Sequence, residues 1–327
     1  MRLPSLKKRE VKVETCLLDI DMYDIIIVGA GPAGLTAAIY ARRASKKVLV
    51  LEAINYGGQL ASILDIENYP GYEHIDGFDL ATKLYDQAIN LGSEIIFERV
   101  IDIKNNNKEK EVVTKNSTYK GKTVIIATGS ENRKLGLPNE NYLIGKGVSY
   151  CATCDGNFYK GKNVAVIGNG KIALEDAIYL SDICNTVYLV HKESELDGDE
   201  NVLSSIKEKD NINVIHNSSV TKLIADDMLT GIELKSSDGL KTINVDGVFV
   251  AIGRVPENEN FRKIIDLNEK GYILSGENCH TNVMGIFAAG DNRVKSLRQL
   301  VTATNDGAIA ANEAIKYINK EWRDNNV

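Results

Sequence analysis

The sequence predicts an α/β fold made of two similar domains, the second inserted into the first. Two observations indicate this fold. A strand, a glycine-rich turn and a helix follow one another in the same order twice, at 23–43 and at 162–181. A further apolar strand and a long helix come after the second copy and return the chain to the first domain. With 327 residues, the chain is long enough for two domains.

The first copy has the pattern of a dinucleotide site. An apolar run, Ile25 to Val28, is typical of a parallel strand covered on both faces. Gly29, Gly31 and Gly34 then lead into an apolar-periodic helix, so G-x-G-x-x-G stands between a strand and a helix. Such a turn lets a pyrophosphate approach the backbone N–H groups at the helix start. The next strand ends at Glu52, placed to accept a hydrogen bond from a ribose hydroxyl.

The second copy repeats this pattern in register. Gly168, Gly170 and Ala173 follow an apolar strand, and the next strand ends at His191. The first glycine and the end of the second strand are 23 residues apart in both copies. One glycine-rich turn alone is weak support for a nucleotide site, but two in register with matching strands are strong support. We therefore predict two Rossmann-like nucleotide-binding domains.

The segment "GIFAAGDNR", 285–293, predicts a short strand that ends at Gly290 and Asp291. An acidic side chain there can bind a sugar-alcohol hydroxyl, although an ordinary strand-to-turn corner is the alternative. A long amphipathic helix follows. The predicted division is an N-terminal arm at 1–21, the first part of the first domain at 22–133, the inserted domain at 134–258, and the second part of the first domain at 259–327.

The segment "CATCDG", 151–156, places two cysteines close together before the second glycine-rich strand. A C-x-x-C pair can form a small disulfide ring, and a thiolate from it can exchange with another disulfide. A zinc site requires a second pair of ligands at suitable spacing, and Cys184 and Cys279 are isolated, so we expect no metal. Two structural cysteines remain an alternative, but Asp155 beside them is costly to bury. A redox pair, with Asp155 as proton carrier, is favoured.

Several segments together resemble the low-molecular-weight thioredoxin reductases. They are "GAGPAG", "GGQL" (57–60), "ENYPG" (67–71), "IIATG", "GKGVSYCATCDG" (145–156), and "GIFAAGD" followed by "RQ" (298–299). The resemblance extends over about residues 22–318. It implies an FAD-dependent enzyme that passes two electrons from a reduced donor, NADPH by family default, to thioredoxin. Cys154 would lie next to the flavin, Cys151 would attack the thioredoxin disulfide, and Asp155 would carry the proton.

The resemblance also assigns residues to the two nucleotides. Gln59 and Asn68 would lie near the flavin, Asp291 on the ribityl chain, and Arg298 and Gln299 at the pyrimidine end of the ring. The positions expected to bind FAD are Gly29, Gly31, Pro32, Ala33, Gly34, Glu52, Gly58, Gln59, Leu60, Asn68, Ala127, Thr128, Gly129, Gly290, Asp291, Arg298, Gln299 and Leu300. The positions expected at the second nucleotide are Gly168, Gly170, Ala173, His191 and Lys192.

The donor site departs from the family pattern. NADPH users carry H-R-R-x-x-x-R after the second strand, because arginines bind the 2′-phosphate. Here "HKESELD" puts Glu193 and Asp197 in place of both arginines, and residues 191–200 hold five carboxylates and one lysine. Two like charges ~4 Å apart repel by ~4 kcal/mol at an effective dielectric constant of about 20. NADH, with Glu193 reaching the ribose, and a non-nicotinamide donor such as ferredoxin or a deazaflavin remain alternatives.

The amino-acid composition limits which classes of partner and which cell compartment we expect. A net charge of −6 disfavours nucleic acid and anionic membranes. Five cysteines are too few for a secreted disulfide scaffold, so we expect a cytoplasmic protein, and no apolar run is long enough to span a membrane. Thioredoxin or a similar small dithiol protein is the expected partner, and the resemblance implies a homodimer. A non-catalytic flavin-bound redox sensor is the alternative outside enzymes.

The order of the segments suggests a movement. The inserted domain carries both the cysteine pair and the second nucleotide site, yet both must meet one flavin. We hypothesise that this domain rotates on linkers near Asn132–Pro138 and Pro256–Phe261.

Overall fold

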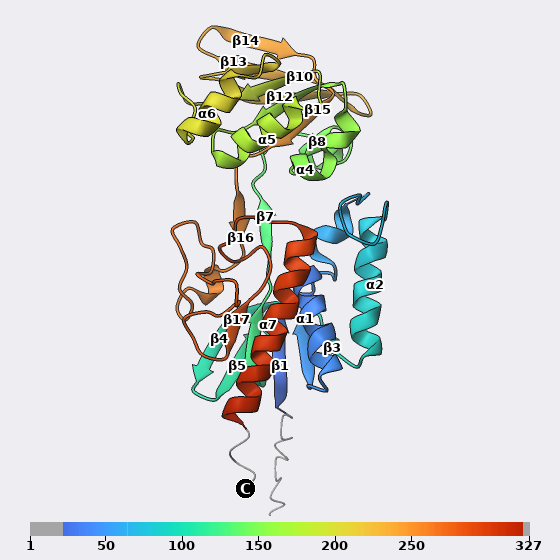
Figure 1. The fold of residues 1–327 in the computed structure, drawn as a ribbon, viewed down its shortest axis with the longest axis vertical. Helices are drawn as coiled ribbons and strands as arrows, with labels where there is room; N and C mark the ends of the chain where they lie inside the picture. The colour runs from blue at the N-terminus through green and yellow to red at the C-terminus, as the bar shows by residue number, and fades with distance from the viewer. Residues whose placement is uncertain (1–21, 64, 323–327) are drawn as a thin grey trace, which may run out of the picture.

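The computed structural model describes residues 22–63 and 65–322, so the predicted N-terminal arm, 1–21, and Cys16 within it lie outside the described residues. The chain forms two lobes joined by a two-stranded ribbon (Figure 1). The ribbon consists of β7 (Ser130–Asn132) and β16 (Arg254–Pro256), which pair antiparallel. The predicted insertion of the second domain into the first therefore agrees with the connectivity. The boundaries at 133 and 258 remain predictions, and each falls shortly after a strand of this ribbon.

The first lobe contains a seven-stranded sheet of order β3-β2-β1-β6-β5-β4, with β17 paired to β6. Its strands are β1 (Tyr23–Val28), β2 (Val48–Leu51), β3 (Glu94–Ile96), β4 (Val100–Asn106), β5 (Glu109–Thr114), β6 (Thr118–Ile126) and β17 (Ile286–Ala288). Strands β3, β2, β1, β6 and β17 are mutually parallel, so their carboxyl ends lie along one edge of the sheet. This edge gathers the loops that carry the predicted first nucleotide site.

Side chains of β1 alternate between two cores, as the two-residue period of a strand requires. Ile25 and Ile27 belong to the core under α1 (Pro32–Arg43) and α7 (Leu300–Glu321), and Ile26 and Val28 belong to the core on the other face. Helix α2 (Gly77–Asn90) packs outside α1 (Figure 1). The continuous apolar run of the sequence is thus explained by burial on both faces.

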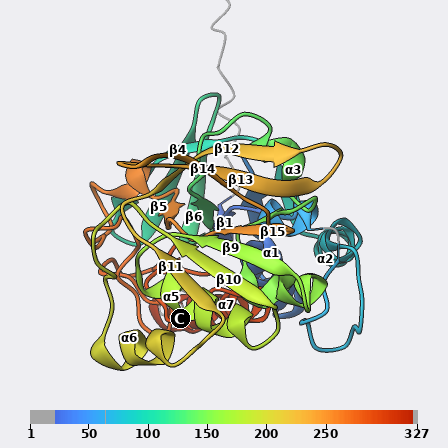
Figure 2. The same ribbon diagram turned by 90° about the horizontal axis from the view of Figure 1, so that it is seen from above.

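The second lobe has a parallel five-stranded sheet of order β11-β10-β9-β15-β8. Its strands are β8 (Val148–Ser149), β9 (Asn163–Ile167), β10 (Thr186–Val190), β11 (Ile212–Ile215) and β15 (Gly247–Val250). Helices α5 (Lys171–Ser181) and α6 (Glu200–Lys207) flank one face, and an antiparallel sheet of β12 (Ser219–Ala225), β13 (Leu229–Ser236) and β14 (Gly239–Ile243) covers the other (Figure 2). Short helices α3 (Glu140–Leu143) and α4 (Ala152–Asp155) complete the lobe.

Within residues 22–63 and 65–322, short 3₁₀ helices lie in the connections: η1 (Gly58–Ser62), η2 (Gly156–Tyr159) and η3 (Glu259–Phe261). Among the residues that the structure describes, no helix is both long enough and apolar enough to cross a membrane. The two Rossmann-like units predicted from the repeated motif are confirmed.

A buried ion pair fastens α7 to the segment after β17. Asp306 of α7 accepts hydrogen bonds from Arg293 Nε at 2.8 Å, Arg293 Nη2 at 2.7 Å, Lys295 Nζ at 2.8 Å and the N–H of Gly290 at 2.9 Å. The side chains of Arg293 and Asp306 are only 2% and 1% exposed. Because the four donors converge on one carboxylate, they also fix the backbone that leads to Asp291.

Candidate active site

The two predicted redox cysteines form a disulfide at the start of α4. Cys151 precedes the helix in an extended conformation, and Cys154 lies in its single turn. The other cysteines in the described part of the chain, Cys184 and Cys279, are buried and free. Burial raises the pKa of the Cys184 thiol to about 11 and that of Cys279 to about 12. Both therefore stay protonated and unreactive at neutral pH.

The disulfide lies against Gln299, the residue that caps the N-terminus of α7 in the first lobe. Gln299 Nε2 donates a hydrogen bond to Thr153 Oγ1 at 2.9 Å and lies 3.9 Å from Cys151 Sγ. Gln299 Oε1 lies 3.9 Å from Cys154 Sγ and accepts from Asn68 Nδ2 at 3.3 Å. The structure thus brings together residues that separate motifs predicted. They are Asn68 and Gln299 of the first lobe and the two cysteines of the second.

Asp155 lies beside the disulfide in a partly apolar environment. Its Oδ2 accepts a hydrogen bond from Ser149 Oγ at 2.5 Å. Burial raises the pKa of Asp155 above its usual value, and the Ser149 bond partly opposes this rise. A carboxyl with a raised pKa holds its proton to a higher pH than an exposed carboxyl does, which is a property that a proton carrier needs. The sequence motifs did not single out Ser149, although its position two residues before Cys151 was a signal.

A cleft of about 290 Å³ lies at the carboxyl edge of the first sheet. Gly29, Glu52 and Thr128, all predicted, line it. Glu52 Oε2 accepts from the N–H of Ala30 at 2.7 Å, which holds the carboxylate next to the glycine-rich turn. Lining residues that sequence motifs did not indicate are Ala53, Arg99, Val100, Val255, Pro256, Glu257, Glu259, Asn260 and Phe261, together with the strand residues Val28 and Leu51. Most of them lie in connections, where no motif marks them.

The other predicted FAD residues surround the same edge. Gly31, Pro32, Ala33 and Gly34 form the turn and the start of α1; Ala127, Thr128 and Gly129 follow β6; Gly290 and Asp291 follow β17; Gly58, Gln59 and Leu60 lie in η1; and Leu300 begins α7. The parallel register sets Val28 beside Ile126, and Ile126 beside Ala288, so the three connections leave the sheet at one level. Arg298 lies over the Tyr272 ring, 4.2 Å from its centroid.

The arrangement has room for FAD and offers it one buried polar atom that lacks a partner. A Cβ on Gly31 or Gly129 would meet no atom within 4 Å, so the backbone there faces open space. Asp291 Oδ2 is paired with Arg254 Nη1 at 3.1 Å, but its buried Oδ1 has no hydrogen-bond partner. A buried acceptor of this kind normally has a partner, and a ribityl hydroxyl would supply one. The residues present therefore fit an FAD dinucleotide.

The second glycine-rich turn is built as predicted but is crossed by the loop after β10. Gly168 leaves β9 with φ 152°, and a Cβ there would lie 2.4 Å from Ala251 O. Asn169 Nδ2 donates to Glu193 Oε2 at 3.2 Å and to Glu195 O at 2.9 Å. Asn169 Oδ1 accepts from the N–H of Asp197 at 3.0 Å. Glu193 is therefore held beside the turn, while Gly170 caps the N-terminus of α5 and Ala173 lies in its first turn.

Charge at this turn is negative. His191, at the end of β10, is 3% exposed, and its Nδ1 lies 3.4 Å from Glu193 Oε2. Burial, followed by repulsion from His216, lowers the pKa of His191, so the imidazole is neutral at pH 7. The backbone N–H of Glu193 and then Asn169 lower the pKa of Glu193, so this group is a carboxylate. Lys192 is exposed next to them, and Lys171 Nζ lies 3.7 Å from Glu175.

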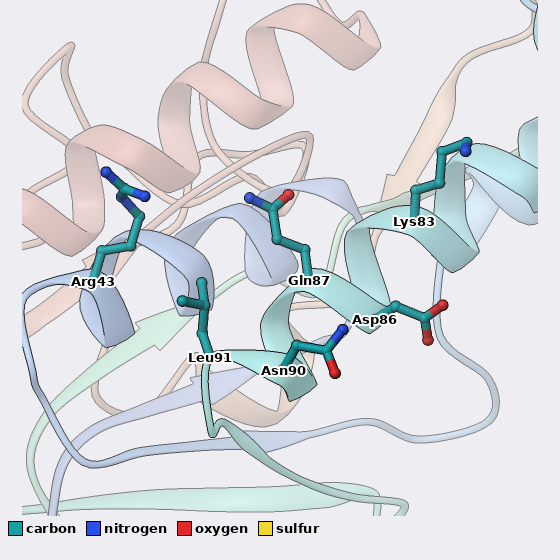
Figure 3. Close-up of a pocket in the computed structure, with 6 residues that line it drawn as sticks. All are labelled: Arg43, Lys83, Asp86, Gln87, Asn90 and Leu91. Atoms are coloured by element: carbon teal, nitrogen blue, oxygen red, sulfur yellow. The ribbon is translucent and has the colours of Figure 1, made fainter.

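Two other features contain none of the predicted residues. A surface pocket of about 470 Å³ between α1 and α2 is lined by Arg43, Lys83, Asp86, Gln87, Asn90 and Leu91 (Figure 3). Asp65, Glu67 and His74 place their ligand atoms within 4.8 Å of one another, and His74 Nδ1 lies 3.0 Å from Asp65 Oδ2. This exposed group is an ion-pair cluster, and we assign no metal to it.

Comparisons with known proteins agree with this geometry. Residues 23–307 match the family model described as pyridine nucleotide-disulphide oxidoreductase. A thioredoxin reductase of Listeria monocytogenes is 41% identical over 300 residues, which cover 91% of this chain and 94% of that protein. The structure resembles thioredoxin reductase from Streptococcus pyogenes with 38% identity and a TM-score of 0.87, covering 91% of this chain and 99% of that one. The Lactococcus lactis enzyme, in a state its description calls the FR conformation, has 37% identity, a TM-score of 0.63, and coverage of 90% and 99%.

Proposed function

The chain belongs to the thioredoxin reductases of the pyridine nucleotide-disulphide oxidoreductase family, and we propose that its redox step occurs where Gln299 meets the Cys151–Cys154 disulfide. It is an FAD-dependent thioredoxin-disulfide reductase. The contact of Gln299 Nε2 with Thr153 Oγ1 at 2.9 Å carries the proposal. This contact brings the disulfide to the first lobe beside the residues that we expect around the flavin.

The two sulfurs are proposed to have separate tasks, because exchange through a mixed disulfide needs one attacking and one resolving sulfur. FAD, when bound and reduced by the donor, would supply the two electrons that open the disulfide. Cys154 is the sulfur that receives them, and Cys151 is the sulfur that attacks the thioredoxin disulfide. Asp155 carries the proton that this cycle requires. Family membership favours this enzyme over a non-catalytic flavin-bound sensor.

The FAD site is proposed to use the residues at the edge of the first sheet. The backbone of Gly29, Gly31 and Gly34 would hold the pyrophosphate, and Glu52 the adenosine ribose. Asp291 Oδ1 would accept from the ribityl chain, which is supported by its lack of a partner. The purified chain is expected to be yellow, and its flavin, once reduced, should recover its colour when oxidised thioredoxin is added. A colourless chain that takes up no FAD contradicts the proposal.

For the electron donor, we propose a nicotinamide nucleotide without a 2′-phosphate, NADH, in place of the family default, NADPH. The support is the charge at the second turn: His191 is neutral, and Glu193, held by Asn169, is a carboxylate beside Lys192 where an arginine would bind a phosphate. A carboxylate that lies near a ribose can accept from its 2′-hydroxyl, and it repels a phosphate at the same place. Reduced ferredoxin or a deazaflavin is the donor if neither nucleotide acts.

The donor proposal predicts the order of flavin reduction rates. In anaerobic stopped-flow experiments at equal concentrations, NADH should bleach the flavin at least about tenfold faster than NADPH, as the repulsion implies. The double variant Glu193→Arg, Asp197→Arg should reverse this preference. Asp238→Arg, in the exposed β13–β14 turn, is the control for added positive charge and should leave it unchanged. Fast bleaching by NADPH at low micromolar concentration contradicts the proposal, as does bleaching by ferredoxin alone.

A rotation of the second lobe on the β7–β16 ribbon is proposed to bring the second turn to the flavin in place of the disulfide. The difference in superposition between two relatives of almost equal identity supports a variable lobe orientation in the family. A chemical crosslink between the lobes should therefore stop multiple turnover while it preserves a single transfer from reduced flavin to the disulfide. Full turnover in the crosslinked protein contradicts the rotation.

We also propose that the protein is a homodimer and lies in the cytoplasm. Analytical ultracentrifugation tests the dimer, and cell fractionation tests the location.

A further inference from the structure

A buried serine touches two parts of the redox segment. Ser149 ends β8, is 4% exposed, and is held by parallel pairing with Phe249 of β15. Its Oγ lies 2.5 Å from Asp155 Oδ2 and 3.1 Å from the backbone nitrogen of Cys151. One hydroxyl thus joins the carboxyl of Asp155 to the backbone of Cys151.

The direction of these hydrogen bonds is fixed by chemistry. A backbone N–H only donates, so the Ser149 oxygen must accept from Cys151. The hydroxyl has one proton, which can point to Asp155 Oδ2 at 2.5 Å or to Cys151 O at 3.3 Å. A short bond to a carboxylate is the stronger of the two. Ser149 is therefore a donor to Asp155 whenever Asp155 is ionised.

Few groups act on Asp155. Burial raises its pKa and the Ser149 bond lowers it. Tyr159 of η2 is a titratable neighbour; burial, and after it the charges of Asp155 and Asp246, raise the pKa of Tyr159 to about 12, so it stays neutral. Helix α5, which packs on α4, presents Tyr179 and Leu180 to Gly156, and Ile183, just after the helix, lies beside them. When the disulfide is open, the thiols of Cys151 and Cys154 are further titratable neighbours.

We propose that Ser149 is a positioning residue that holds the Asp155 carboxyl beside the cysteine pair and stabilises its ionised form between proton transfers. The inference rests on the proposed role of Asp155. Reduction of the Cys151–Cys154 bond by two electrons, which reduced FAD would supply, forms two sulfur anions. The Asp155 carboxylic acid gives its proton to the Cys154 sulfur and becomes a carboxylate that accepts a hydrogen bond from Ser149, while the Cys151 sulfur stays a thiolate.

The second half of the cycle returns the proton. The Cys151 thiolate attacks the thioredoxin disulfide, so one S–S bond breaks, a mixed disulfide forms, and one thioredoxin thiolate leaves. The Cys154 thiol then loses its proton to the Asp155 carboxylate as its sulfur attacks Cys151. The Cys151–Cys154 bond forms again, the second thioredoxin thiolate leaves, and water protonates both thiolates. Ser149 donates to Asp155 during the interval in which it is charged.

The test is the pH dependence of the dithiol–disulfide exchange step in the FAD-loaded protein with thioredoxin. The Asp155 limb is the part of this pH profile in which the rate changes as Asp155 ionises. Removing a donor to the carboxylate raises its pKa, so Ser149→Ala should move the Asp155 limb by about one pH unit to higher pH. Ser149→Thr keeps the hydroxyl and should restore the wild-type limb. Ser93→Ala is the control. Ser93 lies in the first lobe, its buried hydroxyl has no hydrogen-bond partner among the described residues, and its removal should leave the limb in place.

Asp155→Asn separates the two proposals. If Asp155→Asn removes the limb but Ser149→Ala does not move it, the inference on Ser149 is wrong and the role of Asp155 stands. If Asp155→Asn keeps both limb and rate, the role of Asp155 is wrong, and the inference falls with it. Should Ser149→Ala not fold, as far-UV circular dichroism would reveal, Ser149→Cys replaces it. Its weaker S–H donor should shift the limb in the same direction by less, and an unmoved limb then overturns the inference.

Discussion

Changing either Cys151 or Cys154 to serine is expected to lower the rate of thioredoxin reduction by at least roughly a thousandfold. A serine oxygen cannot form the disulfide through which the two electrons pass, and the free thiols of the described residues, Cys184 and Cys279, are buried. Reduction of the bound flavin by the donor should remain, because it precedes the disulfide step. Stopped-flow bleaching and steady-state turnover, measured on the same samples, separate the two.

Cys184→Ser is the matched control for this prediction. Cys184 lies in the same lobe, but it is buried and its thiol is protonated, with its pKa raised to about 11 by burial. Its loss should leave turnover near the wild-type rate. Wild-type-like turnover in either Cys151→Ser or Cys154→Ser would show that another group reduces thioredoxin, and the proposed roles of the two sulfurs would then be wrong.

The second large effect is expected on stability. Asp306→Asn leaves the charges of Arg293 and Lys295 buried without their counter-ion, since their side chains are 2% and 5% exposed. Removing one partner of a buried ion pair lowers the free energy of unfolding by about 3–5 kcal/mol. Urea unfolding of the FAD-loaded protein at pH 7, followed by circular dichroism, measures the change.

The same variant predicts a pH dependence. Burial would raise the pKa of Asp306, but hydrogen bonds from Arg293 and Lys295 outweigh it and lower the pKa below its usual value. The ionised carboxylate therefore stabilises the fold above the unfolded pKa of about 3.9, and this contribution is lost as the pH falls through the lower, folded pKa. The difference between wild type and Asp306→Asn should be full at pH 7 and should shrink in acid below about pH 4.

Glu313→Gln on the same helix is the control. Glu313 pairs with Lys316 at 2.6 Å and with His280 at 3.0 Å, but the partners are 64% and 50% exposed. Exposed pairs contribute about 0–1 kcal/mol, so this change should be small at every pH. An equal loss in both variants would contradict the account of Asp306 as a buried counter-ion.

Local patterns in the sequence predicted the parts of the fold that depend on neighbouring residues. The two glycine-rich turns follow from backbone conformation: Gly29, with φ 108°, has a position where a Cβ would lie 2.4 Å from Ala127 O. The C-x-x-C disulfide likewise forms within one helical turn. Such features need only a few residues in a row, so a motif can indicate them.

Contacts between distant segments could not be read from the sequence in this way. The Gln299–Thr153 bond joins residues 146 positions apart, and the Arg254–Asp291 pair joins strand β16 to the loop after β17, 37 positions away in the sequence. The resemblance indicated Asp291 but not the arginine that takes one of its oxygens. Asn169 lies between the two glycines of the second G-x-G, a position where the motif allows any residue. The motif therefore does not predict that Asn169 orients the loop that carries Glu193.

The β7–β16 ribbon has a consequence for how such a protein can arise and be altered. Asn132 and Arg254 lie opposite each other in the ribbon, so the chain leaves the first lobe and re-enters it at adjacent points. In evolutionary terms the second lobe is an enlarged hairpin loop. A gene can gain, exchange or lose it without interrupting either of the two hydrophobic cores on the faces of the first sheet. An engineer can therefore replace everything between these two strands with a tight turn and keep the first lobe as a continuous polypeptide.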